Sequence, residues 1–274
     1  MEQKANTYLV PVDFTPAAAS ATRFAVEMAS KDDAEIILLH IIKSERDRRT
    51  AETEMKDFSE KHASDHGKLQ TKVIEGGLSE EIEQVAKIMG ADLIIMGTHC
   101  ITGLGKMFRS HAFKIVENVS VPLIIVQKET SFTSIKKIVM TVDLERESVQ
   151  IISMAARISK LFNAEIVLVA KQQAESEFKQ KLNVNLLVCE KILHEKKVPY
   201  KVVLVDGKDF VAEIFQLCKE EKADLLAATY YQQHVHIFTE SFVQTLAYND
   251  FHIPMLTMDE ETTHSGTQFG AMWG

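Results

Sequence analysis

The chain repeats its own sequence pattern once, and this repeat strongly constrains how it can fold. Four segments of the first half return in the same order in the second: YLVPVDF (8–14) as IVMTVDL (138–144), AEIILLH (34–40) as AEIVLVA (164–170), ADLIIMGT (91–98) as ADLLAATY (223–230) and VPLIIV (121–126) as IPMLTM (253–258). The first two pairs are 130 residues apart and the last two are 132 apart. This near-constant spacing predicts a duplicated domain of about 130 residues.

Each half alternates short apolar runs with longer helical patterns. The runs are continuous and rich in branched residues, which favours strands buried on both faces of a parallel sheet. The expected strands are 9–12, 35–42, 71–75, 92–96 and 121–126, then 138–142, 165–170, 200–205, 224–228 and 253–258. The expected helices are 16–30, 44–66, 79–89 and 110–118, then 148–162, 172–197, 211–221 and 241–249. This alternation predicts the α/β class, with two tandem doubly wound domains that have helices on both faces of each sheet.

The domain boundary is expected in the short polar segment KETSFTS, residues 128–134. Residues 1–130 then form domain 1 and residues 134–260 form domain 2, and so short a linker predicts that the two pack against each other. Residues 261–274 form a polar, Gly-containing tail. The tail is expected to be flexible, and docking of Trp273 onto a groove or a partner is the alternative.

Composition excludes several classes of protein. The chain has 274 residues, of which 46% are hydrophobic and 26% charged, and a net charge of −8, as in soluble two-domain proteins. The negative charge and the absence of a basic stripe argue against nucleic acid or an anionic membrane as a partner. The first residues, MEQKANTY, lack the apolar core of a signal peptide, and no apolar run is long enough to span a membrane. We therefore expect a cytoplasmic protein.

The predicted fold places a candidate site beyond the carboxyl ends of the strands, where the strand order reverses. Two pieces of each half are expected there: the aspartate after the first strand, Asp13 or Asp143, and the loop after the fourth strand, 97–109 or 229–240. Asp13 is suited to accept a hydrogen bond from a ribose hydroxyl, or to cap the helix that follows it. The glycines of the first loop are suited to cradle a phosphate or to form a structural turn. Both alternatives stay open.

At this point the sequence resembles a known family, the universal stress proteins. The resemblance rests on YLVPVDFT, IILLHII and MGTHCITGLGKMFRSHAFKIVENVSVPLIIV in this order, and covers residues 8–127 with specific segments and 135–259 more faintly. It implies a five-stranded parallel sheet in each domain. It also implies that the last strands, 121–126 and 253–258, pair with each other. The chain would then be an intramolecular pseudo-dimer, and further homodimerisation stays open.

One branch of this family binds ATP through a loop of the form Gly-x-x-Gly, nine residues, then Gly and Ser or Thr. Gly97 fits the first position, but Cys100, Ser110 and His111 occupy the other three. The resemblance implies these candidate ligand-binding residues: Pro11, Val12, Asp13, Ile41, Met96, Gly97, Ser110, His111 and Ala112. In the second half none of the four loop positions fits, the residues being Thr229, Gln232, Phe242 and Val243.

These departures predict that ATP binds the first half weakly or not at all. Cys100 and Ser110 place side chains where a phosphate must approach the backbone, at a cost of roughly 1–3 kcal/mol each. Two such costs weaken binding by factors of roughly tens to thousands. Against this, Lys106, Arg109 and His111 cluster at the helix entry, where cations favour phosphate unless they are simply solvated surface charges.

The histidines and cysteines supply no complete metal site. His234 and His236 are spaced to share a zinc ion, but no third ligand follows from spacing, and exposed loop histidines are the alternative. Cys100 is either a redox-sensitive thiol or a small residue in place of glycine. His40 ends a buried strand and is expected to be a hydrogen-bonded core histidine. We predict no bound metal and no catalytic residue.

The expected function is that of a cytoplasmic universal stress family protein, which acts in the stress response by binding a ligand or a protein partner. The alternative is an ATP-binding regulator with slow ATPase activity in the first-domain cleft. A third reading is a structural interaction module in which side chains such as Phe242 and Phe238 fill the clefts.

Overall fold

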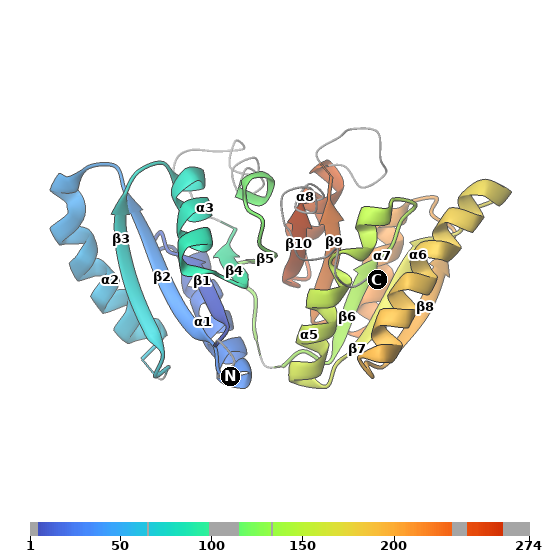
Figure 1. Ribbon diagram of the computed structural model, residues 1–274, viewed down its shortest axis with the longest axis horizontal. Coiled ribbons are helices and arrows are strands. Elements are labelled where there is room, and N and C mark those ends of the chain that lie inside the picture. The colour runs from blue at the N-terminus through green and yellow to red at the C-terminus, as the bar shows by residue number, and fades with distance from the viewer. Residues whose placement is uncertain (1–4, 65, 99–114, 133, 232–239, 260–274) are drawn as a thin grey trace.

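The computed structural model describes residues 5–64, 66–98, 115–132, 134–231 and 240–259. Within these residues, ten strands form one sheet in the order β3-β2-β1-β4-β5-β10-β9-β6-β7-β8. The first half contributes β1 (Thr7–Pro11), β2 (Glu35–Ile42), β3 (Leu69–Glu75), β4 (Leu93–Gly97) and β5 (Leu123–Val126). The second contributes β6 (Lys137–Thr141), β7 (Glu165–Lys171), β8 (Tyr200–Val205), β9 (Leu225–Tyr230) and β10 (Met255–Asp259). Figure 1 shows the halves side by side, meeting at β5 and β10.

Helices cover both faces of this sheet. The first half has α1 (Pro16–Asp32), the 3-10 helix η1 (Glu45–Asp47), α2 (Arg48–His62) and α3 (Leu78–Met89). The second has the 3-10 helix η3 (Arg146–Val149), α5 (Ile152–Phe162), α6 (Ser176–Glu195), α7 (Phe210–Glu221) and α8 (Glu240–Ala247). The helices α1, α2, α5 and α6 pack on one face, and α3, α7 and α8 on the other. In the described part of the chain, no helix is both long enough and apolar enough to cross a membrane.

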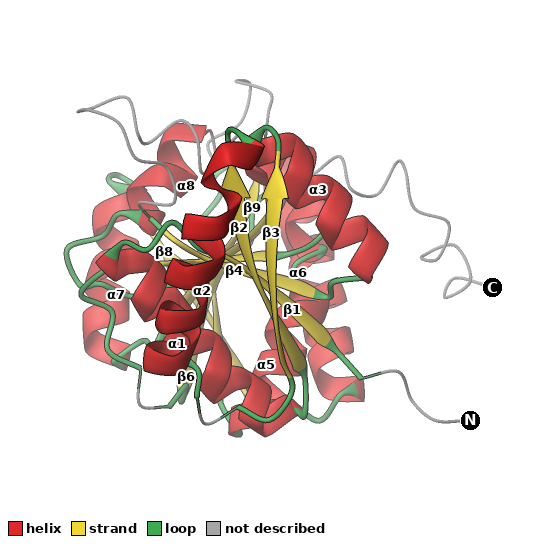
Figure 2. Ribbon diagram, turned by 90° about the vertical axis from the view of Figure 1, so that its left-hand side faces the viewer, coloured by secondary structure: helices red, strands yellow, loops and turns green. Residues whose placement is uncertain are grey.

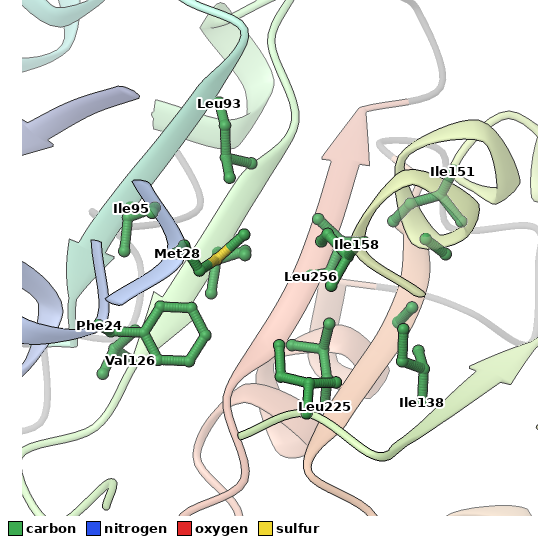
Figure 3. Packing of buried hydrophobic residues seen from close by; sticks show 14 of the residues in the cluster. Phe24, Met28, Leu93, Ile95, Val126, Ile138, Ile151, Ile158, Leu225 and Leu256 are labelled. Atoms are coloured by element: carbon green, nitrogen blue, oxygen red, sulfur yellow. The ribbon is translucent and has the colours of Figure 1, made fainter. Parts of the chain in front are cut away.

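Within each half all paired strands are parallel, and the two halves join through one antiparallel pair. Met255 lies opposite Ile125 in this pair, and Leu256 lies opposite Ile124. The predicted pairing of the last strands is therefore confirmed. Because the ladder runs through β5 and β10 without interruption, buried side chains from both halves form one continuous cluster, of which Figure 3 shows the central part.

The linker contributes to this junction through an aromatic side chain. The ring of Phe132 lies with its centroid 4.5 Å from that of Phe24 in α1 and 5.7 Å from that of Phe162 in α5. Nearby, Arg157 of α5 forms an ion pair with Asp32 at the end of α1. The prediction that a short linker leaves the halves packed together is confirmed.

The predicted bounds of three helices were wrong. The helix expected at 148–162 is split into η3 and α5, and the long helix expected at 44–66 is the short η1 followed by α2. The helix expected at 172–197 begins only at Ser176. Of the helix expected at 110–118, residues 115–118 are described and are helical. The break between η3 and α5 matters for the candidate site, because this segment follows β6.

Candidate functional site at the carboxyl ends of the strands

The strand order reverses between β1 and β4, which are neighbours in the sheet although β2 and β3 lie between them in sequence. On one side β1 pairs with β2, with Pro11 opposite Leu39; on the other it pairs with β4, with Leu9 opposite Ile94. The chain segments that leave β1 and β4 therefore start next to each other. This is the position at which open α/β sheets bind ligands.

Gly97, the last residue of β4, lies against the first turn of α1. A Cβ atom at Gly97 would lie 2.5 Å from the carbonyl carbon of Ala17 and 2.7 Å from the backbone nitrogen of Ala18. Backbone atoms cannot give way as the end of a flexible side chain does, so only glycine allows α1 to begin this close to β4. Gly97 thus has a packing role in the described structure.

The turn between β1 and α1 is built around Asp13. Its Oδ1 accepts hydrogen bonds from the backbone nitrogen of Thr15, at 3.1 Å, and from the Thr15 hydroxyl, at 2.6 Å. Thr15 is the N-cap of α1 and accepts from the nitrogen of Ala18, and Pro16 opens the helix. The sequence left open whether Asp13 caps the helix. In the structure Thr15 caps the helix, and Asp13 accepts hydrogen bonds from Thr15.

Phe14 has a left-handed backbone, with φ of 62°. This conformation costs a residue with a side chain about 1–2 kcal/mol. The Phe14 ring lies 4.5 Å from the His40 ring and 5.7 Å from the Phe58 ring, between centroids, and this packing offsets the cost. Such strain concentrates at functional sites. The sequence analysis missed Phe14 because nothing in its residue type signals a positive φ.

His40 holds the end of β1 in place. Its Nδ1 donates a hydrogen bond of 2.7 Å to the carbonyl oxygen of Val12, which fixes the proton on that ring nitrogen. The prediction of a hydrogen-bonded histidine is therefore confirmed. His40 lies next to Ile41, which belongs to the candidate site, so that β2 and the residues after β1 are held together.

The remaining candidate residues are distributed between the core and the part of the chain outside the described ranges. The side chains of Val12 and Met96 are buried in the hydrophobic core, 3% and 0% exposed, and Ile41 is half-buried. Pro11 is buried at the end of β1. Ser110, His111, Ala112 and Cys100 lie outside the described residues. The structure therefore brings together the residues from β1, β2 and β4, and these stay predictions as ligand contacts.

In the second half, the corresponding aspartate is covered by a tyrosine. Asp143 Oδ1 accepts from the backbone nitrogen of Glu145, at 2.8 Å, and from the hydroxyl of Tyr231, at 3.2 Å. Tyr231 is 1% exposed. Burial raises the pKa of Asp143 to about 6, against the opposing effect of these hydrogen bonds. The pKa of Tyr231 is also raised, first by burial and then by the Asp143 charge.

The second half also replaces the glycine at the end of the fourth strand. Thr229 stands where the first half has Gly97, and its hydroxyl donates to the carbonyl oxygen of Glu147 in η3 at 3.4 Å. Here the chain forms η3 before α5 starts, whereas α1 begins directly at Pro16. Phe242, at a loop position of the family pattern, is buried and stacks on Phe210 with a centroid distance of 5.9 Å.

No group of three or more histidine, cysteine or acidic side chains in the described ranges is arranged to hold a metal ion. His234 and His236 lie outside those ranges, as do Phe238 and the tail with Trp273. The two described cysteines, Cys189 and Cys218, are buried, and burial raises the pKa of each thiol to about 12.

Comparison with known proteins matches this arrangement to one family. Residues 5–127 match the model of the universal stress protein family. The first half of the chain belongs to this family. A universal stress protein of Methanocaldococcus jannaschii is 27% identical over 138 residues, which cover 44% of this chain and 81% of that protein.

Two solved structures extend the likeness of fold to nearly the whole chain. A universal stress protein from Archaeoglobus fulgidus, 14% identical, has a TM-score of 0.71 and covers 93% of this chain and 96% of its own. A functionally unknown protein from Pseudomonas aeruginosa, also 14% identical, has a TM-score of 0.64 and covers 95% of each chain. Both halves therefore share the universal stress protein fold, as expected from the repeat.

Proposed function

We propose that this universal stress protein acts in the cytoplasm, in the stress response, by binding a small ligand or a protein partner rather than by catalysing a reaction of its own. Its two units are residues 1–130 and 134–260, and residues 261–274 follow the second. The observation that carries the proposal is the difference between the two equivalent sites. The first keeps Gly97 against α1, and the second has Tyr231 over Asp143.

The first half is the proposed ligand-binding half. Its contacts would come from Pro11, Val12, Asp13 and Ile41, together with the segment that follows Gly97. The turn at Asp13 is ordered by Thr15 and the end of β1 is held by His40, so the residues that would meet a ligand are positioned beforehand. In the second half the corresponding carboxylate already has Tyr231 as its hydrogen-bond partner, so a ligand would have to displace a buried side chain.

ATP is proposed to bind weakly. Cys100, Ser110 and His111 replace the family pattern at three positions, and the side chains of Cys100 and Ser110 hinder the close approach of phosphate to the backbone. An ATP-binding regulator with slow ATPase activity is the second candidate. It is favoured by the retained Gly97, which keeps the helix α1 close to the end of β4.

Titration calorimetry with magnesium and ATP tests this proposal. We expect dissociation constants in the millimolar range for the wild type, weaker binding for Asp13→Ala and no change for the matched variant Asp143→Ala. Thermal unfolding would verify that both variants are folded. Micromolar affinity that Asp13→Ala abolishes would replace the proposal by the regulator. Weaker ATP binding by the Asp143→Ala variant would show that the ligand binds to the second half and not to the first.

A further inference from the structure

A second surface feature lies between α1, the end of α2 and the linker. It is a groove of about 550 Å³, and none of its lining residues belongs to the candidate site described above. Both helices pack on the same face of the sheet, and Figure 2 shows α2 on the opposite side of β3 from α3. Polar and charged side chains line most of the groove, although the chain as a whole carries a net charge of −8.

Three nitrogen-bearing side chains converge in this groove: Arg23 of α1, and Lys61 and His62 at the end of α2. The guanidinium of Arg23 donates to His62 Nδ1 at 3.3 Å and to the hydroxyl of Ser20 at 3.0 Å. Within the described residues neither Arg23 nor Lys61 forms an ion pair. Glu27 lines the same groove without pairing with either of them. Positive charge is therefore concentrated here and only partly balanced.

The pKa of His62 is consistent with this positive potential. It is lowered from its ordinary value, first by burial and then by the charges of Arg23 and Lys61. The charged groups that line the groove together with the imidazole are Arg23 and Glu27 from α1 and Lys61 from its own helix. The Phe58 ring lies at a centroid distance of 4.7 Å from the imidazole. An anion bound between Arg23 and Lys61 would reverse the effect of these charges and favour protonation of His62.

The groove also has an apolar side. Val26 and Phe132 line it, and Phe132 is held in place by Phe24 and Phe162. The ligand that fits both sides has an anionic group and an apolar body. A guanidinium, an ammonium and an imidazole together match the oxygens and the double charge of a phosphate ester better than a single carboxylate.

The second half does not repeat this cluster. At the offset of 130 residues that relates α1 to α5, Ser153 stands where the first half has Arg23. The cluster is thus a property of the first half and not a general consequence of the fold.

We propose that this groove binds a small phosphomonoester, with the phosphate held by Arg23, Lys61 and His62 and the apolar part resting on Val26 and Phe132. The proposal does not depend on the site at Asp13, because the two share no residue. Phenyl phosphate is a suitable probe, since it carries one phosphate and one aromatic ring.

The test is an NMR titration of the full chain with phenyl phosphate, followed on the His62 ring resonances. We expect saturable binding that shifts these resonances and raises the pH at which His62 titrates. Arg23→Gln should weaken binding at least about tenfold, as expected for loss of a charged hydrogen bond. Removing the opposing charge by Glu27→Gln should tighten it.

Three controls make the result decisive. Arg49→Gln removes an exposed arginine elsewhere on α2 and should change nothing, and so should Asp13→Ala, which alters the other site. Inorganic phosphate should bind more weakly than phenyl phosphate. The proposal is overturned if the His62 resonances stay unmoved, if Arg23→Gln binds like the wild type, or if inorganic phosphate binds equally well.

Discussion

The two halves of this protein have strands in the same order, but the fourth strand ends differently in each half. In the first half β4 ends in Gly97, and α1 begins within van der Waals reach of it. In the second half β9 continues through Thr229 to Tyr230, and the chain forms η3 before α5 starts. The residue at this position of the fourth strand is Gly97 in one half and Thr229 in the other. The segment after the first strand also follows a different path in the two halves.

The two aspartates show the same divergence. Both aspartates accept a hydrogen bond within their own turn, Asp13 from Thr15 and Asp143 from Glu145. Asp143 also accepts from Tyr231, which follows the fourth strand. After duplication one copy of the site can lose its function without loss of the fold, because burial of apolar strands stabilises both copies alike. The difference teaches that equivalent residues in a repeat need not have equivalent roles.

The largest effect expected from this comparison follows from Gly97→Ala. The added methyl group would meet the backbone of Ala17 and Ala18, so the free energy of unfolding should fall by about 3 kcal/mol. The matched control is Gly67→Ala, where the new Cβ has no atom within 4 Å. Urea unfolding of both variants measures the difference. Equal midpoints would mean that Gly97 is not required for the close packing of α1.

A smaller loss is expected for Tyr231→Phe. The change removes the hydrogen bond to a half-buried carboxylate and should lower the free energy of unfolding by about 1–2 kcal/mol. Tyr200→Phe serves as the control, because Tyr200 is half-buried and makes no hydrogen bond through its hydroxyl within the described residues. Thermal unfolding at neutral pH compares the two. If both variants lose the same stability, the covering role of Tyr231 is wrong.

The pH dependence of stability should identify Asp143. Its pKa is raised from 3.8 to about 6 in the folded protein, so between these values the native state holds a proton that the unfolded chain has released. The contribution of Asp143 to stability is therefore greatest below pH 3.8 and is lost as the pH rises through about 6. Asp143→Asn lacks this titration. The stability of the variant relative to the wild type should rise across that interval and then stay constant; a flat difference would contradict the assignment.

The smallest effect concerns the helix ends, where the halves again differ. Both α3 and α7 end in a left-handed residue, but this is Gly90 in the first half and Lys222 in the second, with φ of 60° and 56°. Lys222→Gly should stabilise the protein by about 0.5–1 kcal/mol, and Gly90→Lys should destabilise it by a similar amount. Denaturation midpoints of the two variants should move in opposite directions.

Much of the fold was predictable because the buried strands carry continuous apolar runs. The bounds expected for β2 and β8 agree with the structure, and the pairing of β5 with β10 was anticipated. The break between η3 and α5 was not predicted. The helical pattern of residues 148–162 is continuous, and the interruption coincides with a contact to Thr229 from a distant strand.

The candidate site was predictable only in part. The position of Asp13 and Gly97 followed from the fold, but the packing of Gly97 on α1 and the left-handed Phe14 depend on tertiary contacts. The role of Tyr231 could have been suspected from the aromatic pair Tyr230 and Tyr231 at the end of β9, where the first half has Thr98 and His99. Local sequence could not indicate that its hydroxyl reaches Asp143.

The most direct test of the central claim is an amide NMR titration of the full chain with magnesium and ATP at millimolar concentration, a range in which weak binding is visible. The account predicts shifts centred on Val12, Asp13, Ile41 and Gly97 in the first half, and undisturbed resonances at Asp143, Thr229 and Tyr231. Shifts centred on Asp143 and Tyr231, or equal shifts in both halves, would contradict it.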